Sequence, residues 1–179
     1  MNLLAEAQQA AKALDQSVSA QLRTRRLESA KRLFFRLRSY LYDQCKNNAF
    51  HHDIYSKIKF QSPDKAGMAL ITLGPSIDKE TTEDHIHFES GSRLSFGITI
   101  REVAGSSELV SYRFHHAFTS GHSPAFLRFD LNGEEHSEPL REPRSHLHPG
   151  IESVRMPTPV LHPVEILDRV FFAIEASVK

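Results

Sequence analysis

Apolar residues recur at intervals of mostly three and four through the first 45 or so residues of the chain. The stripe consists of Leu4, Ala7, Ala11, Leu14, Val18, Leu22, Ala30, Leu33, Leu37 and Leu41. This spacing places apolar side chains along one face of an α-helix, and the segment contains neither Gly nor Pro. The pattern therefore predicts one long helix, or two helices in series, within residues 1–48.

A single helix of this length would be long compared with the rest of the protein. About 40 helical residues span roughly 60 Å, which exceeds the width of a domain built from the remaining residues. Arg25 and Arg26 interrupt the apolar stripe near its middle. We therefore expect part of the segment to project, to pair with another copy as a coiled coil, or to dock on a partner protein.

From residue 68 onward the pattern changes to short runs rich in β-branched and aromatic residues, which predict strands. The runs are 68–73, 85–89, 93–102, 108–118 and 125–131. Short separators containing Gly and Ser favour hairpins between them. Every second residue from Leu94 to Ile100 is apolar, whereas Arg93, Ser95 and Thr99 at alternate positions are polar. The sequence thus predicts an antiparallel sheet of four or five strands with one face in the core.

The remaining third of the chain consists of two segments with different sequence patterns. Residues 133–163 show no periodicity and hold six prolines, so we expect a long loop, and loops of this length are often functional. The residues after Pro163 predict a closing helix, with Glu165 near its positive end. The predicted fold is α+β: a long N-terminal helix or helical hairpin, the sheet, and a C-terminal helix packed on it. We divide it into a basic helical arm, 1–48, and an α+β domain, 49–179.

Composition excludes several classes of protein. The chain has 179 residues and 40% hydrophobic residues, with 22 Lys+Arg against 22 Asp+Glu, as an ordinary globular protein does. The single Cys45 cannot form an intramolecular disulfide or a Cys-rich zinc site. No apolar run reaches the roughly 18 residues of a membrane span, and the first residues lack a basic signal-peptide region. We therefore expect a cytoplasmic protein that does not contact a membrane.

The zero net charge conceals a basic segment near the N-terminus. Residues 1–50 hold nine Lys+Arg and four Asp+Glu, which leaves 13 against 18 for the rest. The clustered cations are Arg23, Arg25, Arg26, Lys31, Arg32, Arg36 and Arg38. Such a stretch can neutralise nucleic-acid phosphates, dock on an acidic protein, or form a solvated face beside a coiled-coil seam.

Eleven histidines are the other unusual feature. His85 and His87 share a strand face, whereas the adjacent His115 and His116 must point to opposite faces. The pair His146 and His148 lies in the proline-rich segment. No HExxH or Cys–His spacing is present, so the histidines are candidate ligands for zinc or another divalent metal, candidate general acids and bases, or structural residues.

Arg128 and Asp130 alternate with apolar residues and so share a strand face. They form either an ordinary surface ion pair, or an anion-binding Arg beside a carboxylate that orients an imidazole. If a metal is bound, Asp130 or a neighbouring carboxylate would join the histidines as a ligand. The sequence has no phosphate-binding GxxxxGK[ST] or GxGxxG and no GxSxG, so we assign no other cofactor.

From about residue 85 onward the chain resembles the TumE-like toxins of prokaryotic toxin–antitoxin pairs and related uncharacterised proteins. The resemblance rests on SYRFHHAF, LRFDLNGEEH, PLREPRSHLHPG and LHPVEILDRVF. Carried over position by position, it implies a site built from Arg113, Arg128, Asp130, His136, His146 and His148. It also implies a role in a toxin–antitoxin or antiviral defence module that binds or cleaves nucleic acid.

Two functional hypotheses follow. If the chain is an enzyme, we expect a ribonuclease-like phosphodiesterase in which His146 or His148 exchanges protons, Arg128 stabilises the phosphate and Asp130 orients an imidazole. His136 would join this site. The alternative is a non-enzymatic accessory subunit whose N-terminal helix docks on a larger protein or on another copy, with structural histidines. The sequence leaves open which of the two holds.

Overall fold

The computed structural model describes residues 3–24, 27–46, 57–74, 85–103, 105–133, 135 and 143–175. The helices are α1 (Leu3–Thr24), α2 (Ala30–Lys46) and α3 (Pro163–Asp168), which continues into the π-helical turn η3 (Arg169–Ile174). The strands are β1 (Lys59–Gln61), β2 (Met68–Leu73), β3 (Ile86–His87), β4 (Arg93–Val103), β5 (Ser106–Ala117), β6 (Phe126–Leu131), β7 (Ser145–His148) and β8 (Met156–Pro157).

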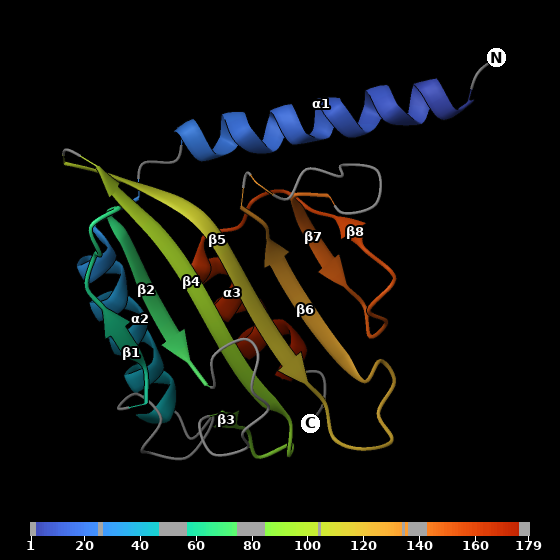
Figure 1. The fold of residues 1–179 in the computed structure, drawn as a ribbon. Coiled ribbons are helices and arrows are strands. Elements are labelled where there is room, and N and C mark those ends of the chain that lie inside the picture. Colours follow the sequence, from blue (N-terminus) through green and yellow to red (C-terminus); the bar gives the residue numbers. More distant parts are fainter. Residues whose placement is uncertain are drawn as a thin grey trace.

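All eight strands form one antiparallel sheet in the order β1-β2-β4-β5-β6-β7-β8, with β3 paired to β4. Figure 1 shows α2 and α3 behind this sheet, while α1 runs along one end of the strands and beyond them. No helix in the described part of the chain covers the other face, which we call the open face. The α+β class and the antiparallel sheet are therefore confirmed, with more strands than the four or five predicted.

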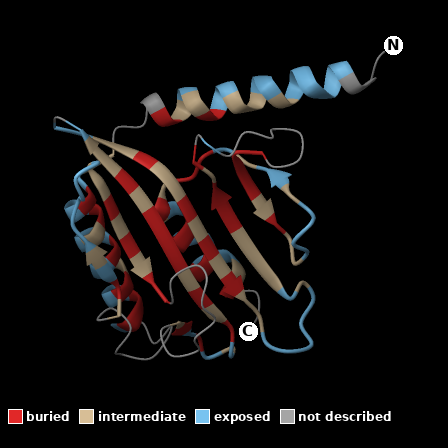
Figure 2. Cartoon of the chain, in the orientation of Figure 1, coloured by how far each residue is buried: buried red, intermediate tan, exposed pale blue. Residues whose placement is uncertain are grey.

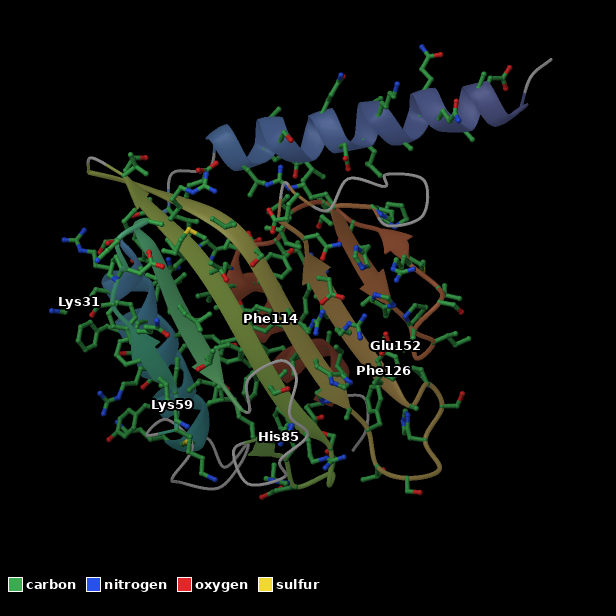
Figure 3. The ribbon with its side chains drawn as sticks, viewed as in Figure 1. Lys31, Lys59, His85, Phe114, Phe126 and Glu152 are labelled. Carbon is green, nitrogen blue, oxygen red and sulfur yellow. The ribbon has the colours of Figure 1, made fainter. Side chains whose placement is uncertain are left out.

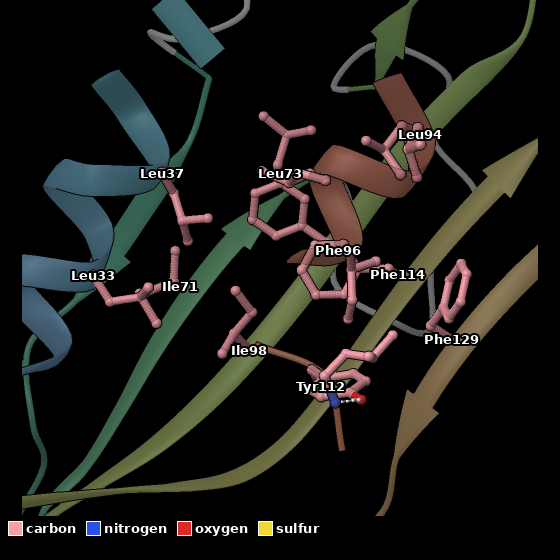
Figure 4. Packing of buried hydrophobic residues seen from close by; sticks show 14 of the residues in the cluster. Leu33, Leu37, Ile71, Leu73, Leu94, Phe96, Ile98, Tyr112, Phe114 and Phe129 are labelled. Atoms are coloured by element: carbon pink, nitrogen blue, oxygen red, sulfur yellow. Dashed lines mark hydrogen bonds between the residues drawn. The ribbon is translucent and has the colours of Figure 1, made fainter. Parts of the chain in front are cut away.

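The core lies between the sheet and the helices α2 and α3. Leu94, Ile98 and Ile100 of β4 are fully buried, as their alternation predicts. Leu33 and Leu37 of α2 are also completely buried, and Figure 4 shows them beside Ile71 of β2. The second half of the N-terminal apolar stripe thus packs inside this chain and is not available to a partner.

Of the two alternatives predicted for the N-terminal segment, one long helix is wrong, because the segment forms the two helices α1 and α2. Between them, Leu27 makes a β-bridge with Ser107. The side chain of Ser29 accepts the amide of Arg32, and the carboxylate of Glu102 accepts the amide of Ala30 at 2.7 Å. These acceptors satisfy amides of the first turn of α2, where negative charge is favourable. Anchoring of that turn to the sheet ends the continuous helix.

The predicted loop at 133–163 contains two strands, β7 and β8. They escape prediction because β7 has the polar sequence SHLH and β8 has two residues, so neither shows apolar alternation. Pro157 is tolerated because β8 is the outer strand of the sheet. The strand β1, with three residues, is missed for the same reason.

The closing helix begins where the sequence predicts. Pro163 occupies the first turn, and His162 and Glu165 form a reciprocal capping box with each other's backbone. The π-helical turn that follows has no counterpart in the prediction. None of the described helices combines the length and apolarity needed to cross a membrane.

Candidate functional site

Strand register gathers a polar cluster on the open face. Arg113 of β5 pairs with Asp130 of β6, and Asp130 pairs with His146 of β7. In the neighbouring row, His115 pairs with Arg128, which pairs with His148. Directly paired residues on adjacent strands point to the same face. With Glu152 from the segment after β7, which contacts Arg128, these residues form what we call the Arg–His cluster.

Three ligand-type atoms of the cluster converge on one point. The Nε2 atoms of His146 and His148 are 3.0 Å apart. The Oδ2 atom of Asp130 lies 3.3 Å from Nε2 of His148 and 3.6 Å from Nε2 of His146. The exposed fractions of the three residues are 4% or less. This trio is thus a buried, compact group of three potential metal ligands.

Arg128 connects the trio to the surface. Its Nε donates to Oδ2 of Asp130 at 2.7 Å, and its Nη2 donates to Nε2 of His148 at 2.8 Å. Its Nη1 donates to both carboxylate oxygens of Glu152 at 2.7 Å. Burial opposes the charge of Arg128, but the two carboxylates outweigh it and hold the guanidinium pKa above its ordinary value.

Glu152 is the exposed member of the cluster, with a side chain that is 64% exposed. The chain turns at Gly150, whose φ of 83° lies in the left-handed region that glycine adopts readily, and Glu152 follows beside β6 and β7 (Figure 3). Burial acts to raise the pKa of Glu152, but the hydrogen bonds and charge of Arg128 outweigh it and lower that pKa. A carboxylate anion therefore covers the guanidinium on its solvent side.

The other two members differ in exposure. The side chain of Arg113 is 41% exposed, and its Nε lies 3.4 Å from Oδ1 of Asp130. Nε2 of His115 is buried without a hydrogen-bond partner. Burial, and then the charge of Arg128, lower the pKa of His115, so this imidazole is neutral near pH 7.

The protons on the paired imidazoles can be assigned from their partners. An arginine only donates, so Nε2 of His148 accepts from Arg128 and a neutral His148 carries its proton on Nδ1. Nδ1 of His146 lies 2.5 Å from the carbonyl oxygen of Pro143, which only accepts, so this nitrogen carries a proton. In their neutral forms, both rings therefore carry their lone pairs on Nε2, close to Asp130, and that of His148 accepts from Arg128.

The structure thus brings together Arg128, Asp130, His146 and His148, which the sequence singles out, along with Arg113. His136 lies outside the described residues. Direct proton exchange by His146 or His148 requires access to a substrate, and both are closed off in this arrangement, at 1% and 0% exposed.

The cluster also contains residues that the sequence did not assign to it. Strand alternation places His115 on the face of Arg113 and could have found it. Glu152 follows a short polar strand in a segment without periodicity, and no sequence signal marks it. His85 and His87, with ring centroids 6.4 Å apart, are not part of the convergent trio.

The predicted basic surface lies elsewhere. Lys31, Arg32, Arg36 and Arg38 are exposed on α2, which packs on the core side of the sheet and not on the open face. Figure 3 shows Lys31 far from Glu152. The Nη1 atom of Arg36 forms an ion pair with Glu28 at 3.3 Å. The side chain of Arg23 and residues 25–26 lie outside the described part. The described basic side chains and the Arg–His cluster therefore do not form one continuous site.

Comparison of the chain with protein-family models, with curated proteins and with solved structures found no match.

Proposed function

We propose that the Arg–His cluster binds and cleaves a phosphodiester of RNA or DNA, as part of a prokaryotic toxin–antitoxin or antiviral defence module. The observation that carries this proposal is the gathering of two arginines, a carboxylate and three imidazoles on the open face of the sheet. The resemblance to TumE-like toxins supplies the biological setting. Fold alone does not specify an activity, so the chemistry is argued from the cluster.

The arginines suit an anionic substrate. Arg128 already holds a carboxylate with two oxygens, and a phosphate group offers the same kind of acceptor pair. Arg113 is partly exposed on the same face and would contact a second non-bridging oxygen. In this scheme the substrate phosphate replaces Glu152 on Arg128. Two guanidinium groups would then stabilise the charge that develops on phosphorus-bound oxygens.

His115 is the imidazole best placed to exchange a proton with such a substrate. It lies beside Arg128 on the open face and is only partly buried, in contrast to His146 and His148. We therefore assign His115 the acid–base role that the sequence suggested for the other two histidines.

Cleavage of end-labelled single-stranded RNA and DNA by the purified chain tests the proposal. Arg113→Ala should lower the cleavage rate about 100-fold, the usual cost of one preorganised donor. Arg101→Ala is the matched control, since both side chains are 41% exposed and Arg101 pairs with Glu108 outside the cluster. Absence of cleavage of either polymer, or equal effects of the two variants, would refute the assignment.

A second function, partner docking, is favoured by the outer part of α1. Residues 5–10 are all exposed, and Figure 2 shows this part of the helix beyond the end of the sheet. We propose that it contacts another protein or a second copy of the chain. Purification together with the products of neighbouring genes, followed by mass determination, tests this. Recovery of only a 20.3 kDa monomer would contradict it.

A further inference from the structure

We infer that Nε2 of His146, Nε2 of His148 and Oδ2 of Asp130 form a binding site for one divalent transition metal of the zinc class. The inference goes beyond the proposed function, because metal binding requires no nucleic acid and can be measured without any activity. Only the catalytic use of such a metal rests on the proposed function.

The spacing of the three atoms fits a tetrahedral ion. Zinc bonds to imidazole nitrogen and carboxylate oxygen are about 2.0–2.1 Å long, which puts neighbouring ligand atoms of a tetrahedron about 3.3 Å apart. The separations here are 3.0, 3.3 and 3.6 Å. An ion at the centre of the three atoms would therefore find its ligands nearly in place.

The protons of the two imidazoles also favour a cation. The two Nε2 atoms lie 3.0 Å apart, the lone pair of His148 accepts from Arg128, and Asp130 adds a carboxylate oxygen to the same point. Acceptor atoms this close to one another repel, and the guanidinium of Arg128 now supplies the positive charge that two of them need. A divalent ion would satisfy both lone pairs and the carboxylate at once.

Support around His146 and Asp130 matches that of known metal ligands, whereas Nδ1 of His148 is buried without a hydrogen-bond partner. A metal-bound histidine usually donates its second ring proton to a backbone carbonyl or a carboxylate, which fixes the ring. Nδ1 of His146 makes such a bond to the carbonyl of Pro143. The buried Asp130 is oriented by Arg128 and by Arg113. Two of the three ligands are therefore held in position by neighbours.

The donor set indicates the type of metal. Two imidazoles and one carboxylate suit zinc, cobalt, nickel or copper better than magnesium or calcium, which prefer oxygen. Three protein ligands leave a fourth position free in a tetrahedral site, as in catalytic zinc centres. That position would accept a water molecule.

Arg128 competes with the metal for Nε2 of His148, so the proposed site makes a specific prediction about an Arg128 variant. The Nε2 atom of His148 has one lone pair, and Nη2 of Arg128 now occupies it. Oδ2 of Asp130 can accept from Arg128 and still bind an ion. Metal binding must therefore displace the guanidinium from His148, while its Nη1 can remain on Glu152. Loss of the arginine should tighten metal binding.

Calorimetric titration of the chelator-treated full chain with Zn²⁺ tests the site, with Co²⁺ absorption as a second measurement. We expect one equivalent per chain and the visible bands of tetrahedral Co²⁺. His148→Ala and Asp130→Asn should weaken Zn²⁺ binding at least 100-fold, whereas Arg128→Met should strengthen it. His122→Ala removes an exposed histidine outside the cluster and should leave binding unchanged.

The outcomes separate the two proposals. Lack of Zn²⁺ binding by the native sequence overturns the metal site. It is also overturned if the His148→Ala and Asp130→Asn variants bind Zn²⁺ as tightly as the native sequence does. Octahedral Co²⁺ bands would overturn the tetrahedral assignment even if a variant failed to fold. Stoichiometric metal without cleavage of RNA or DNA overturns only the proposed function. Cleavage by a chain that binds no metal overturns only this inference.

Discussion

Glu175 anchors the C-terminal helical segment to the sheet, and its replacement by Gln should measurably destabilise the protein. The residue is 6% exposed. Its carboxylate accepts from the hydroxyls of Ser90, at 2.7 Å, and Ser92, and its Oε1 lies 2.5 Å from Nε2 of the buried His116. Three polar side chains of the sheet region therefore depend on one carboxylate.

The size of the effect follows from the groups left without an acceptor. Leaving one buried polar partner unsatisfied costs about 1–3 kcal/mol, and the buried partners here are His116 and Ser92. Since these share one carboxylate and their costs are not additive, we expect Glu175→Gln to lower the free energy of unfolding by about 3 kcal/mol at pH 7. For a chain of this size that corresponds to a fall in Tm of about 6–12 °C.

The pH dependence has a definite sign. Burial acts to raise the pKa of Glu175, but the hydrogen bonds from His116, Ser92 and Ser90 outweigh it, so the pKa lies below its ordinary 4.5. In the acid range the unfolded chain therefore binds a proton that the native chain does not, and stability rises with pH. The contribution is present above about pH 4.5 and is lost as the pH falls through the lowered native pKa.

Urea unfolding followed by circular dichroism at pH 7 and at about pH 3.5 measures both effects. The exposed Glu89 provides the control variant, Glu89→Gln, which should change stability by less than about 0.5 kcal/mol. The reasoning is refuted if Glu175→Gln costs no more than the control at pH 7. It is also refuted if the cost is as large at the acid pH as at neutral pH.

Three further predictions concern the core, a turn and the cluster. Leu37→Ala should lower the free energy of unfolding by about 2–5 kcal/mol in urea titrations, because Leu37 is completely buried; a cost under about 1 kcal/mol would place it at the surface. Gly67→Ala should lower Tm, since its φ is 77° and an added Cβ would lie 2.5 Å from the carbonyl oxygen of Glu102; an unchanged Tm contradicts this. Glu152→Gln should tighten the binding of inorganic phosphate measured by calorimetry, because it removes the negative charge that now binds Arg128. Equal phosphate affinity of the variant and the native chain would show that Glu152 and phosphate do not compete for Arg128.

Local periodicity determined most of the large elements. The strands β2, β4, β5 and β6 were predicted within a few residues, because each is a run of six residues or more that is rich in aliphatic, β-branched or aromatic side chains. The closing helix was predicted from Pro163 and its apolar spacing. The strands β1, β7 and β8 were missed because two to four residues are too few to show a period.

The candidate site, too, could be predicted from the sequence only in part. Two-residue spacing alone places Arg128 with Asp130, and His146 with His148, on common faces once each pair lies on a strand. That β7 pairs with β6, and that its register sets His146 opposite Asp130, is a property of the assembled sheet. A shift of one residue would turn both histidines to the other face.

The sequence by itself therefore determined the α+β class, the main strands and which polar residues share a face. Only the tertiary structure decided that the N-terminal segment folds back as α2, that the basic helix and the cluster lie on different sides of the sheet, and that Glu152 covers Arg128. The physical reason is that hydrophobic periodicity is a property of neighbouring residues. Strand pairing and the packing of one segment on another depend instead on which distant segments together bury the most apolar surface.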